Sequence, residues 1–590
     1  MSHLNIVAAN PSTPTWINVK ASPYNAAGNG STDDTAAIQA AVNALAAAGG
    51  GVLYIPPGNY KVTSTITWTA NKSLRILGDG ANATSIQRAS AASPFHTFDV
   101  RNVTGGGVEV EHLNILNTVN AGAFSDDQVG LYFAACNRVR LYGVQINSSA
   151  NRVNIATEFS NCNEVSVIAC DLRGYVNAIL STGNTAVFDV VATTTATNSG
   201  SGVPTSGNVA LTVSGGTLHL TNVVTNGGDH GLVLLSGTGA TPGFVYVHDF
   251  EVNNCHGDAV DLNTGAECWF EQLWCSNQSI SNSEAAYHGV NVGSSFDGWV
   301  VFDNCVFQHY SGHGIWIQGG RSYWITNSSF SGCCGNAADT YDDIHVGGTT
   351  SYVTINGNHF DVEPFNSMTP PRSAVYTESG TASVLLDGNT FASSGYGTQT
   401  VLDVGGAITY GGNSGYGGTV SLSQSDVTSY TVTAASFTQA SRTWPIPAYD
   451  GKIGTVYRLT TAGNGRQGST QETFSAQAAV FGTTAVPRGF VSAIVGASGT
   501  FAWRSVIEVE ILSTGSSGSA LVTTTFYMSQ GTTGAGASSA SNSSVCVGTQ
   551  TITGINTTSA TTLGLQLEWG ATTGSPTATS TRSLFERLGP

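Results

Sequence analysis

Positive charge is scarce in this sequence. Its 590 residues include 20 lysines and arginines against 37 aspartates and glutamates, and the formal net charge is −17. No lysine or arginine occurs between Arg173 and Arg321. Because phosphate backbones are bound by basic side chains, we expect no nucleic-acid partner.

Long apolar segments are absent as well. No stretch approaches the roughly 18 apolar residues of a membrane span, so no membrane insertion is expected. The first residues, MSHLNIVAANPSTPTW, have no basic segment followed by an apolar core. We therefore expect no Sec-type signal peptide at this end of the chain.

Cysteine spacings typical of metal sites or redox motifs are missing too. The chain has 10 cysteines, and the pair Cys333-Cys334 is adjacent, which suits neither a zinc site nor a simple disulfide. We expect reduced, buried thiols and no structural metal. What the sequence does contain is glycine, 72 residues of it, with many small and β-branched residues, a composition that favours stacked sheets over helices.

A short helix is predicted near the start of the chain. Asp33 or Asp34 can cap a helix from Thr35 to about Ala48, and the glycines of GGGVLYIPPG end it before a short strand. The apolar stripe of this helix consists of Ile38, Val42 and Leu45. The segments GNGSTDDTAAIQAAV, GGGVLYIPPGNYKV and LRILGDG, within residues 17–86, resemble the opening of pectate-lyase-superfamily β-helices. Such β-helices are common in bacteriophage tailspikes and secreted polysaccharide enzymes. The resemblance implies a helix that plugs the open N-terminal end of a right-handed parallel β-helix, where strand edges would otherwise stay unpaired.

A repeat supports the same fold independently. The pattern apolar-x-apolar-x-turn-x-x-apolar recurs at intervals of about 22–32 residues, which is typical of a solenoid. Its copies begin at Val108, Val139, Val165, Leu218, Val245, Cys268, Val300, Tyr323, Val353 and Val384. Alternation predicts that Phe307, Phe330, Phe360 and Phe391 stack inside the coils. The tight turns should fall at Asn304, Asn327 and Asn356.

The predicted fold is all-β with five segments. These are an N-terminal extension (1–16), a cap with the first coils (17–106), the right-handed parallel β-helix (107–405), a linker (406–450) and a C-terminal β-sandwich (451–590). WRSVIEVEILSTGSSGSALVTTTFYM and LGLQLEWGATTGSPTATSTRSLFERL resemble jelly-roll C-terminal domains of phage tail proteins. That resemblance implies a role in trimerisation or in receptor or carbohydrate binding.

Carboxylates, histidines and aromatic residues align along the middle coils. One row contains His230, Asp258, His288, His313 and Asp342, and a second row, three residues later, contains Asp261, Asn291, Trp316, His345 and Tyr376. Because neighbouring coils stack about 4.8 Å apart, we expect one continuous surface, the polar strip. Glycoside hydrolysis needs two carboxyl groups on such a surface, and aromatic faces such as Trp316 and Tyr287 would stack on sugar rings.

A second resemblance suggests roles within the polar strip. GDAVDL (257–262) and GHGIWIQGG (312–320) resemble two motif segments of polygalacturonase-type glycoside hydrolases. The resemblance implies that Asp258 is the acid and His313 an assisting histidine. Tyr287-His288 stands where that family has its water-activating aspartate pair, so the inverting mechanism is not implied. The candidate catalytic residues are Asp258, Asp261, His288 and His313. The candidate substrate-binding residues are Tyr287, Asn291, Trp316, Asp342 and His345.

No cofactor is expected. Asp339, Asp342 and Asp343 offer oxygen ligands of the kind that Ca²⁺ prefers, but without a defined loop signature. A lyase acting on polyuronates needs cations to stabilise its carboxylate-derived intermediate. The shortage of fixed positive charge therefore favours a hydrolase acting on a neutral or weakly charged glycan.

Three functions remain open from the sequence. The first is a homotrimeric bacteriophage tailspike or tail-fibre depolymerase that binds and hydrolyses a host surface polysaccharide. It would be made in the host cytoplasm and carried with other tail proteins on the virion. The second is a receptor-binding virion protein of the same fold without catalysis. The third is a secreted polysaccharide lyase.

Overall fold

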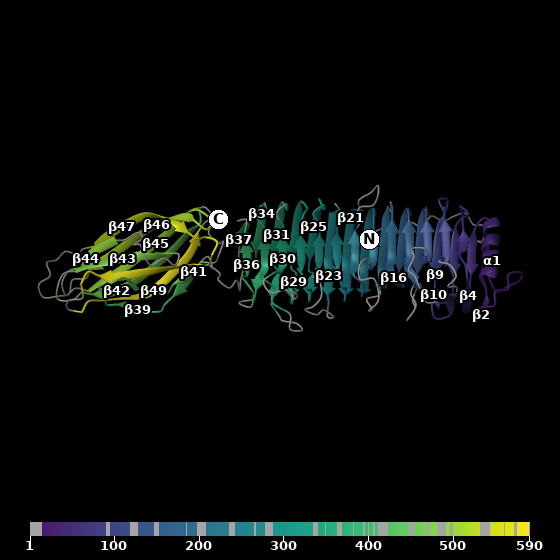
Figure 1. Cartoon of the computed structure of the whole chain (residues 1–590), viewed down its shortest axis with the longest axis horizontal. Coiled ribbons are helices and arrows are strands. Elements are labelled where there is room, and N and C mark those ends of the chain that lie inside the picture. The colour runs from purple at the N-terminus through teal and green to yellow at the C-terminus, as the bar shows by residue number, and fades with distance from the viewer. Residues whose placement is uncertain are drawn as a thin grey trace. The chain divides into compact units, whose positions relative to one another are not determined.

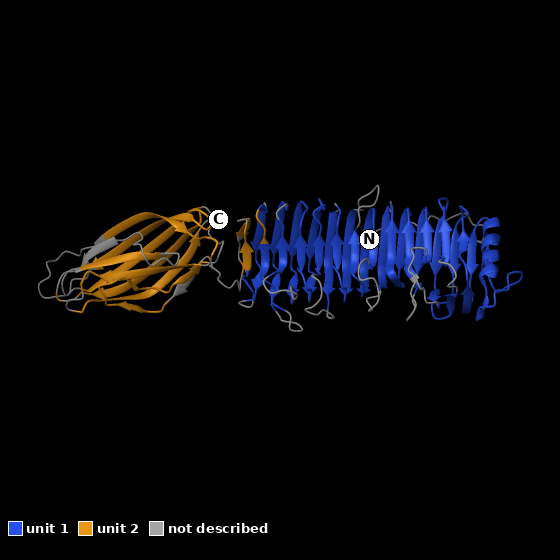
Figure 2. Cartoon of the chain, in the orientation of Figure 1, with its two compact units in different colours: residues 1–376, 380–400 blue, residues 377–379, 401–590 orange. Residues whose placement is uncertain are grey.

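The computed structural model describes residues 15–89, 95–118, 128–146, 153–183, 186–197, 208–234, 242–264, 267–277, 287–333, 340–347, 350–362, 369–381, 383–392, 396–398, 400–404, 407–410, 413, 423–446, 454–467, 469, 472–480, 491–495, 500–530, 543–559, 561–571 and 575–588. The chain forms two compact units (Figure 2), residues 1–376 with 380–400 and residues 377–379 with 401–590.

A solenoid of parallel strands makes up the first unit (Figure 1), and its strands belong to one continuous sheet that runs from β1 to β37. Each coil visits three faces in the order A, C, B. Face A contains β1 (Trp16–Asn18), β3 (Gly51–Tyr54), β6 (Leu74–Leu77), β9 (Gly107–Glu111), β12 (Arg138–Tyr142), β15 (Glu164–Ile168), β17 (Val187–Ala196), β19 (Gly216–Asn226), β21 (Pro242–Asn253), β23 (Glu267–Ser276), β25 (Trp299–Asp303), β28 (Ser322–Thr326), β31 (Tyr352–Asn356), β34 (Ser383–Asp387) and β37 (Ile408–Tyr410).

Face C follows a sharp turn. It contains the later parts of β17, β19, β21 and β23, and the strands β2 (Asn29–Asp33), β4 (Gly58–Val62), β7 (Thr84–Arg88), β10 (Asn114–Asn117), β13 (Gln145–Ile146), β26 (Val306–Gln308), β29 (Ser329–Ser331), β32 (His359–Asp361) and β35 (Thr390–Phe391). Face B contains β5 (Ile66–Trp68), β8 (Phe98–Arg101), β11 (Val129–Ala134), β14 (Val153–Ser160), β16 (Asp171–Thr182), β18 (Val209–Val213), β20 (His230–Leu234), β22 (Val260–Leu262), β24 (Val290–Val292), β27 (Ile315–Ile317), β30 (Asp342–Val346), β33 (Ser373–Thr377) and β36 (Val401–Asp403).

Helix α1 (Thr35–Ala47) lies at the N-terminal end of the solenoid, as Figure 1 shows. Asp33 accepts a hydrogen bond from the Thr35 amide at 3.0 Å, whereas Asp34 accepts bonds from loop amides instead. The helix buries Ile38, Ala41, Val42 and Leu45. The predicted helix and its apolar stripe are therefore confirmed.

The turn between faces A and C requires a left-handed residue. Asn304 and Asn327 adopt φ of 54° and 52°, as expected for the predicted Asn turns. In the next coil Gly357, with φ of 69°, takes this conformation in place of Asn356. Inside the coils the predicted phenylalanine ladder is present, and consecutive rings of Phe307, Phe330, Phe360 and Phe391 lie 4.9 Å apart.

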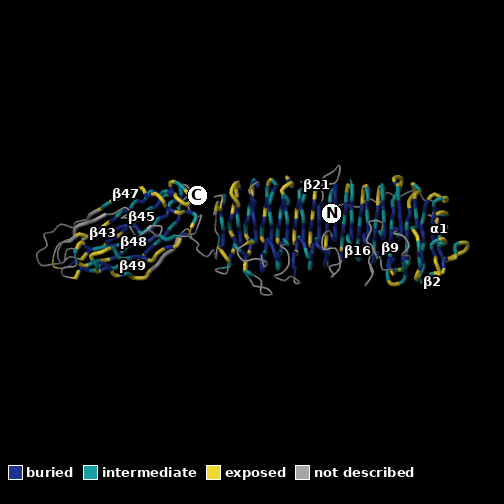
Figure 3. Tube along the Cα trace, viewed as in Figure 1, coloured by how far each residue is buried: buried dark blue, intermediate teal, exposed yellow. Residues whose placement is uncertain are grey.

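Buried and exposed positions alternate along the strands (Figure 3), so one side of each strand faces the interior. The described cysteines of the first unit are buried and carry free thiols, among them Cys255, Cys268, Cys305 and Cys333. Burial raises the pKa of Cys255 to about 12, so this thiol stays protonated. These cysteines act as small apolar residues of the core.

Two antiparallel sheets form the second unit. One sheet contains β38 (Ser423–Asp426), β39 (Tyr430–Val432), β42 (Val456–Arg466), β45 (Thr500–Ser513), β46 (Gly518–Gln530), β47 (Ser543–Ile555) and β49 (Thr577–Leu588). The other contains β40 (Thr438–Gln439), β41 (Trp444–Ile446), β43 (Glu472–Val480), β44 (Val491–Val495) and β48 (Thr561–Trp569). Phe474 of β43 packs against Trp503 and Phe526 of the facing sheet, so the two sheets share one core.

The predicted all-β fold class is confirmed. One boundary differs from the expectation: the segment 406–450, predicted as a linker, contains β37 and the short strands β38 to β41. The latter four pair with β48 and β49 at the sheet edges. Their shortness hid them, because they span four, three, two and three residues and edge strands need little apolar sequence. Among the described residues, no helix is long and apolar enough to cross a membrane.

Candidate functional site

The register of face B brings both rows of the polar strip into line. Asp261 pairs with Asn291, Asn291 with Trp316, and Trp316 with His345 on consecutive coils. The residues of the first row lie where each coil enters this face. There, Ala259 donates its amide to the His288 carbonyl, and Gly289 donates to the His313 carbonyl, each at 3.0 Å.

Two carboxyl groups meet at one end of the strip. The side-chain amide of Asn291 donates to Asp261 at 3.2 Å and also hydrogen-bonds to Asp258. Gln318 fixes this amide by donating to its oxygen at 2.9 Å. Asp258 accepts the His288 backbone amide at 2.7 Å. Asn291, on the next coil, therefore contacts two half-buried carboxyl groups that are three residues apart in sequence.

Burial of this corner changes its acid–base properties. Desolvation raises the pKa of Asp258 to about 6, and the nearby Asp261 carboxylate adds to the rise. Burial also raises the pKa of Asp261, against the lowering effect of its bonds from Asn263 and Asn291. His230 donates Nδ1–H to the Asp258 carbonyl at 3.0 Å, and its charge when protonated opposes both rises. Asp258 is consequently the carboxyl group best suited to release a proton near neutral pH.

His288 and His313 form a stacked pair with fixed tautomers. The His313 amide donates to His288 Nδ1 at 2.8 Å, and the Asp342 amide donates to His313 Nδ1 at 2.9 Å. Each Nδ1 is thus an acceptor, so each neutral ring carries its proton on Nε2. Burial lowers the pKa of His288 to about 3 and that of His313 well below its usual value. Both rings remain neutral and can act as Nε2–H donors.

The Gly-His-Gly segment has a packing reason. A Cβ on Gly312 would lie 2.6 Å from His288 Nδ1 and 2.9 Å from the Tyr287 carbonyl oxygen. The missing side chain therefore lets the His288 ring rest against the next coil and accept its amide. Tyr287 itself is half-buried, and its backbone bonds to Ser311 and Gly312.

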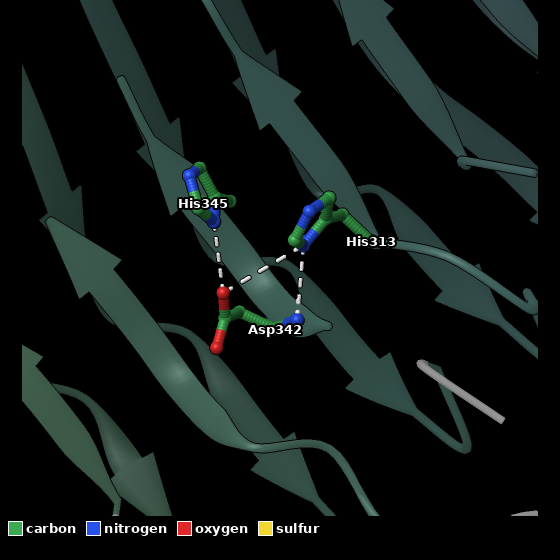
Figure 4. A group of neighbouring side chains, drawn as sticks. All are labelled: His313, Asp342 and His345. Carbon is green, nitrogen blue, oxygen red and sulfur yellow. Dashed lines mark hydrogen bonds and ion pairs between the residues drawn. The ribbon is translucent and has the colours of Figure 1, made fainter. Parts of the chain in front are cut away.

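Asp342 organises the other end of the strip (Figure 4). His345 donates Nδ1–H to Asp342 at 2.9 Å, and His313 lies on the other side of the carboxylate. Arg372 holds both carboxylate oxygens, at 3.0 and 2.5 Å, and Ser373 donates to one of them. This bond sets the tautomer of the neutral His345 ring, with the lone pair on Nε2, as the aspartate of a catalytic triad does for its histidine.

Aromatic rings cover the middle of the strip. The half-buried Trp316 ring lies 4.8 Å from His288 and 5.7 Å from His313, and Tyr376 stacks on His345 at 4.7 Å. The strip thus joins a carboxyl pair, two imidazole donors, an aromatic centre and an Asp–His–Arg cluster within five coils. Carboxyl groups and rings in this arrangement suit carbohydrate chemistry.

Comparison with known families agrees with this architecture. Residues 16–291 match the model described as rhamnogalacturonase A/epimerase, pectate lyase-like, and residues 230–427 match the right-handed beta helix region. The solenoid of this chain is a right-handed parallel β-helix that is similar to pectate-lyase-like proteins. Its family models thus cover face B together with the polar strip.

Individual relatives match smaller parts of the β-helix protein. Mannuronan C5-epimerase AlgE3 of Azotobacter vinelandii is 39% identical over 87 residues, 14% of this chain and 5% of the epimerase. Alginate lyase 7 of the same organism is 36% identical over 87 residues, 14% of this chain and 10% of the lyase. Tailspike protein 3 of bacteriophage CBA120 aligns with a TM-score of 0.46 and 14% identity over 66% of this chain and 59% of the tailspike. The chain therefore spans only a small part of the epimerase and of the lyase.

One group of side chains in the strip offers atoms of the kind that bind metal ions. Ligand atoms of His313, Asp342 and His345 lie within 4.8 Å of one another. In this structure the His313 Nδ1 lone pair accepts the Asp342 amide, and the guanidinium of Arg372 lies against both oxygens of the Asp342 carboxylate. The contacts of this cluster are those of an ion-pair network.

The calcium hypothesis from the sequence is not supported by the positions of its aspartates. Asp343 aligns with Gly314 of the preceding coil, where a Cβ would lie 3.3 Å from the Cys333 sulfur inside the coil. Asp342, whose side chain is also buried, instead bonds to His345 and Arg372. The two carboxylates therefore point to different environments, and Asp339 lies outside the described residues.

Sequence reasoning missed Arg372 and Tyr341. Arg372 lies 3.9 Å above the Tyr376 ring and binds Asp342, and the Tyr341 ring packs edge-on against His313 at 5.2 Å. Extending the first row by one more coil reaches Ser373, next to Arg372, so the repeat contained a signal for the arginine. Tyr341 directly precedes Asp342, but it does not belong to either of the two rows that the repeat aligned.

Proposed function

We propose that this protein is a bacteriophage tailspike or tail-fibre depolymerase that binds a host surface polysaccharide and hydrolyses it internally. The observation that carries the proposal is the pair Asp258 and Asp261 joined by the Asn291 amide. Both carboxyl groups interact with one side chain, so they lie close together on the coil. Retaining glycosidases have such a close pair, with carboxyl groups about 5–5.5 Å apart, in which one is the acid and the other the nucleophile.

Asp258 is the proposed general acid. Its raised pKa of about 6 leaves part of the population protonated near neutral pH, ready to protonate the glycosidic oxygen. Asp261 is the proposed nucleophile, because two side-chain amides hold its carboxylate in place. Cleavage should therefore weaken as pH rises above about 6, since Asp258 then loses the proton it must donate.

The rest of the strip binds the glycan. Neutral His288 and His313 offer Nε2–H donors to sugar oxygens, and Trp316 between them offers a ring face. Such a mixture of one apolar platform and fixed polar groups is typical of sugar-binding sites. The absence of lysine and arginine from residues 174–320 favours a glycan with little negative charge.

The virion location rests on sequence resemblance. The opening segment resembles those of tailspike β-helices, and the C-terminal segment resembles phage tail domains. Homotrimeric assembly, contact with other tail proteins and host adhesion belong to the same proposal. A receptor-binding role without cleavage is the outcome if no bond is broken.

A lyase or epimerase reaction is the second candidate. It is favoured by one observation: His345 is held by Asp342 with its Nε2 unprotonated, beside Tyr376 and Arg372. A base, a phenol and a guanidinium are suited to removing a proton next to a carboxylate. The bidentate ion pair with Asp342 already compensates the Arg372 charge, which makes the hydrolase the better fit.

Purified host capsule or surface glycan incubated with the protein provides the test. We expect new reducing ends without ultraviolet-absorbing products, and first products that keep the anomeric configuration of the substrate. In Asp258→Asn we expect the loss of at least about 100-fold in kcat. Because asparagine keeps an oxygen to accept the His288 amide, folding should persist, as circular dichroism would report.

The matched control is Asp297→Asn. Asp297 is exposed and paired with Arg321 away from the strip, so its loss of charge should leave the rate unchanged. Unsaturated products would show that the protein cleaves by elimination and not by hydrolysis. Binding without either product would leave a receptor-binding protein, and full activity in folded Asp258→Asn would remove that residue from the mechanism.

A further inference from the structure

A band of aromatic rings lies on face A, away from the polar strip on face B. Register places Phe244 and Tyr246 of β21 beside Trp269 of β23, followed by Trp299, Trp324 and Tyr352 on β25, β28 and β31. Intervening residues such as Phe270, Phe302 and Ile325 are buried, so the rings point outward. We call these six residues the aromatic face.

The rings of the aromatic face pack on one another. Trp269 and Trp299 meet at 6.4 Å with an interplanar angle of 77°, and Trp299 and Trp324 meet at 6.1 Å with an angle of 86°. From β23 to β31 the large ring alternates between two rows, one ring per coil. The result is a ridged surface whose rings stand on edge against each other, rather than a set of coplanar platforms.

Much of this ridge is exposed. Phe244, Tyr246, Trp269, Trp324 and Tyr352 have exposed fractions between 42% and 64%. With about 150–250 Å² for each aromatic side chain, these five rings expose about 500 Å². Monomeric proteins rarely carry a contiguous apolar patch of more than a few hundred Å². A stable protein interface covers about 800 Å² on each partner, so the ridge is large enough to form its centre.

Charge is sparse in the two rows that hold the rings. Along these two outward rows from β21 to β34, all of whose residues are described, Glu267 is the one charged residue. A third outward row of face A is acidic and contains Glu271, Asp303 and Asp387. Because the chain carries a formal charge of −17, two copies repel each other over most of their surface, and the two ring-bearing rows are the part of this face where they can approach closely.

We propose that the aromatic face packs against a second copy of this chain. Tryptophan and tyrosine are enriched at the centres of such interfaces, and charge is depleted there. A ridge of edge-on rings fits interlocking side chains better than it fits the flat faces of sugar rings. The inference rests on the self-association within the proposed function and is independent of the proposed cleavage.

Oxidative footprinting of the full chain tests this contact. Trp274 is the matched control, because it lies on the same strand as Trp269 and is equally exposed, at 44%. It follows the left-handed residue Gln272, so it belongs to face C. In the isolated chain these two tryptophans should oxidise equally. In the assembled protein Trp269 and Trp324 should be protected several-fold relative to Trp274.

Mass measurement by light scattering completes the test. The double variant Trp269→Ser/Trp324→Ser should dissociate at concentrations where the wild type and Trp274→Ser stay assembled. A monomeric wild type would overturn both the self-association and this inference. Two results would overturn the inference alone. One is an assembled wild type in which Trp269, Trp324 and Trp274 oxidise equally. The other is a double variant that stays assembled on dilution as well as Trp274→Ser does.

Discussion

Single residues of the polar strip have properties that depend on which atom is already bonded. His288, His313 and His345 cannot be told apart by residue type. The Nδ1 atoms of His288 and His313 accept hydrogen bonds from backbone amides, whereas His345 Nδ1 donates to Asp342. The first two are therefore donors at Nε2, and the third is an acceptor. Contacts with neighbouring coils thus give histidine two different hydrogen-bonding roles in the same strip.

Asp343 is the residue whose burial is hardest to reconcile with its chemistry. It is fully buried, and neither carboxyl oxygen has a hydrogen-bond partner among the described residues. Burial first, and then the charge of Asp342, raise the pKa of Asp343 well above its ordinary value. The neighbouring coils have glycine or alanine at this position, at Gly314 and Ala374.

Replacing Asp343 should stabilise the protein at neutral pH. The folded state keeps this carboxyl protonated while the unfolded state ionises it above pH 3.8. The contribution of Asp343 to stability therefore falls as pH rises from there toward the folded pKa, by up to about 1.4 kcal/mol per unit. In Asp343→Ala this contribution should vanish, with a gain of about 1–3 kcal/mol over the wild type at pH 7. Urea unfolding at several pH values measures both effects.

The control for this prediction is Asp297→Ala on the surface. Its paired carboxylate is exposed, so its removal should change stability little at any pH. An Asp343→Ala variant whose stability relative to the wild type does not increase between pH 4 and 7, or one that is weaker than the wild type at pH 7, would contradict the assigned protonation state.

At the level of elements, the coils are held in register by interior ladders. Phe330 is fully buried between Phe307 and Phe360, at 4.9 Å from each ring. Phe391 lies at the end of the same ladder and has a described ring partner on one side. Stacking of like residues from successive coils makes each interior ring support two neighbours.

Truncation of the middle ring should therefore cost more than truncation of the last. For Phe330→Ala we expect a loss of about 3–5 kcal/mol, from lost burial and the cavity that remains. For Phe391→Ala we expect a smaller loss, because the ladder ends there. Denaturant midpoints of the two variants provide the comparison. Equal losses would mean that the ladder does not act through its ring-to-ring contacts.

At the level of the whole molecule, the site and the second unit are separate in sequence. Every residue of the polar strip precedes residue 377, and the second unit has a core of its own built around residues such as Phe474 and Trp569. A chain that ends at residue 413 should therefore keep the solenoid fold and the kcat/KM for glycan cleavage. Activity assays on the truncated and full chains would show this. A folded but inactive truncated chain would mean that the second unit contributes to the site.

The sequence by itself determined the solenoid, its cap and its interior. These follow from local pattern: the capped helix at Thr35, the period of the apolar strands, the stacked phenylalanines and the left-handed asparagines of two coils. Each depends on a few neighbouring residues, and a fixed repeat length then brings equivalent positions into line. This is why the two rows of the polar strip could be aligned in advance.

Only the tertiary structure decided what the aligned residues do. The neutrality of His313, the ion pair of Asp342 with Arg372, the bridge from Asn291 and the inward position of Asp343 all depend on contacts between coils, tens of residues apart in the chain. The same is true of the aromatic face, whose rings are scattered singly through the sequence. Burial and hydrogen bonding set protonation and exposure, and they exist only once the coils are stacked.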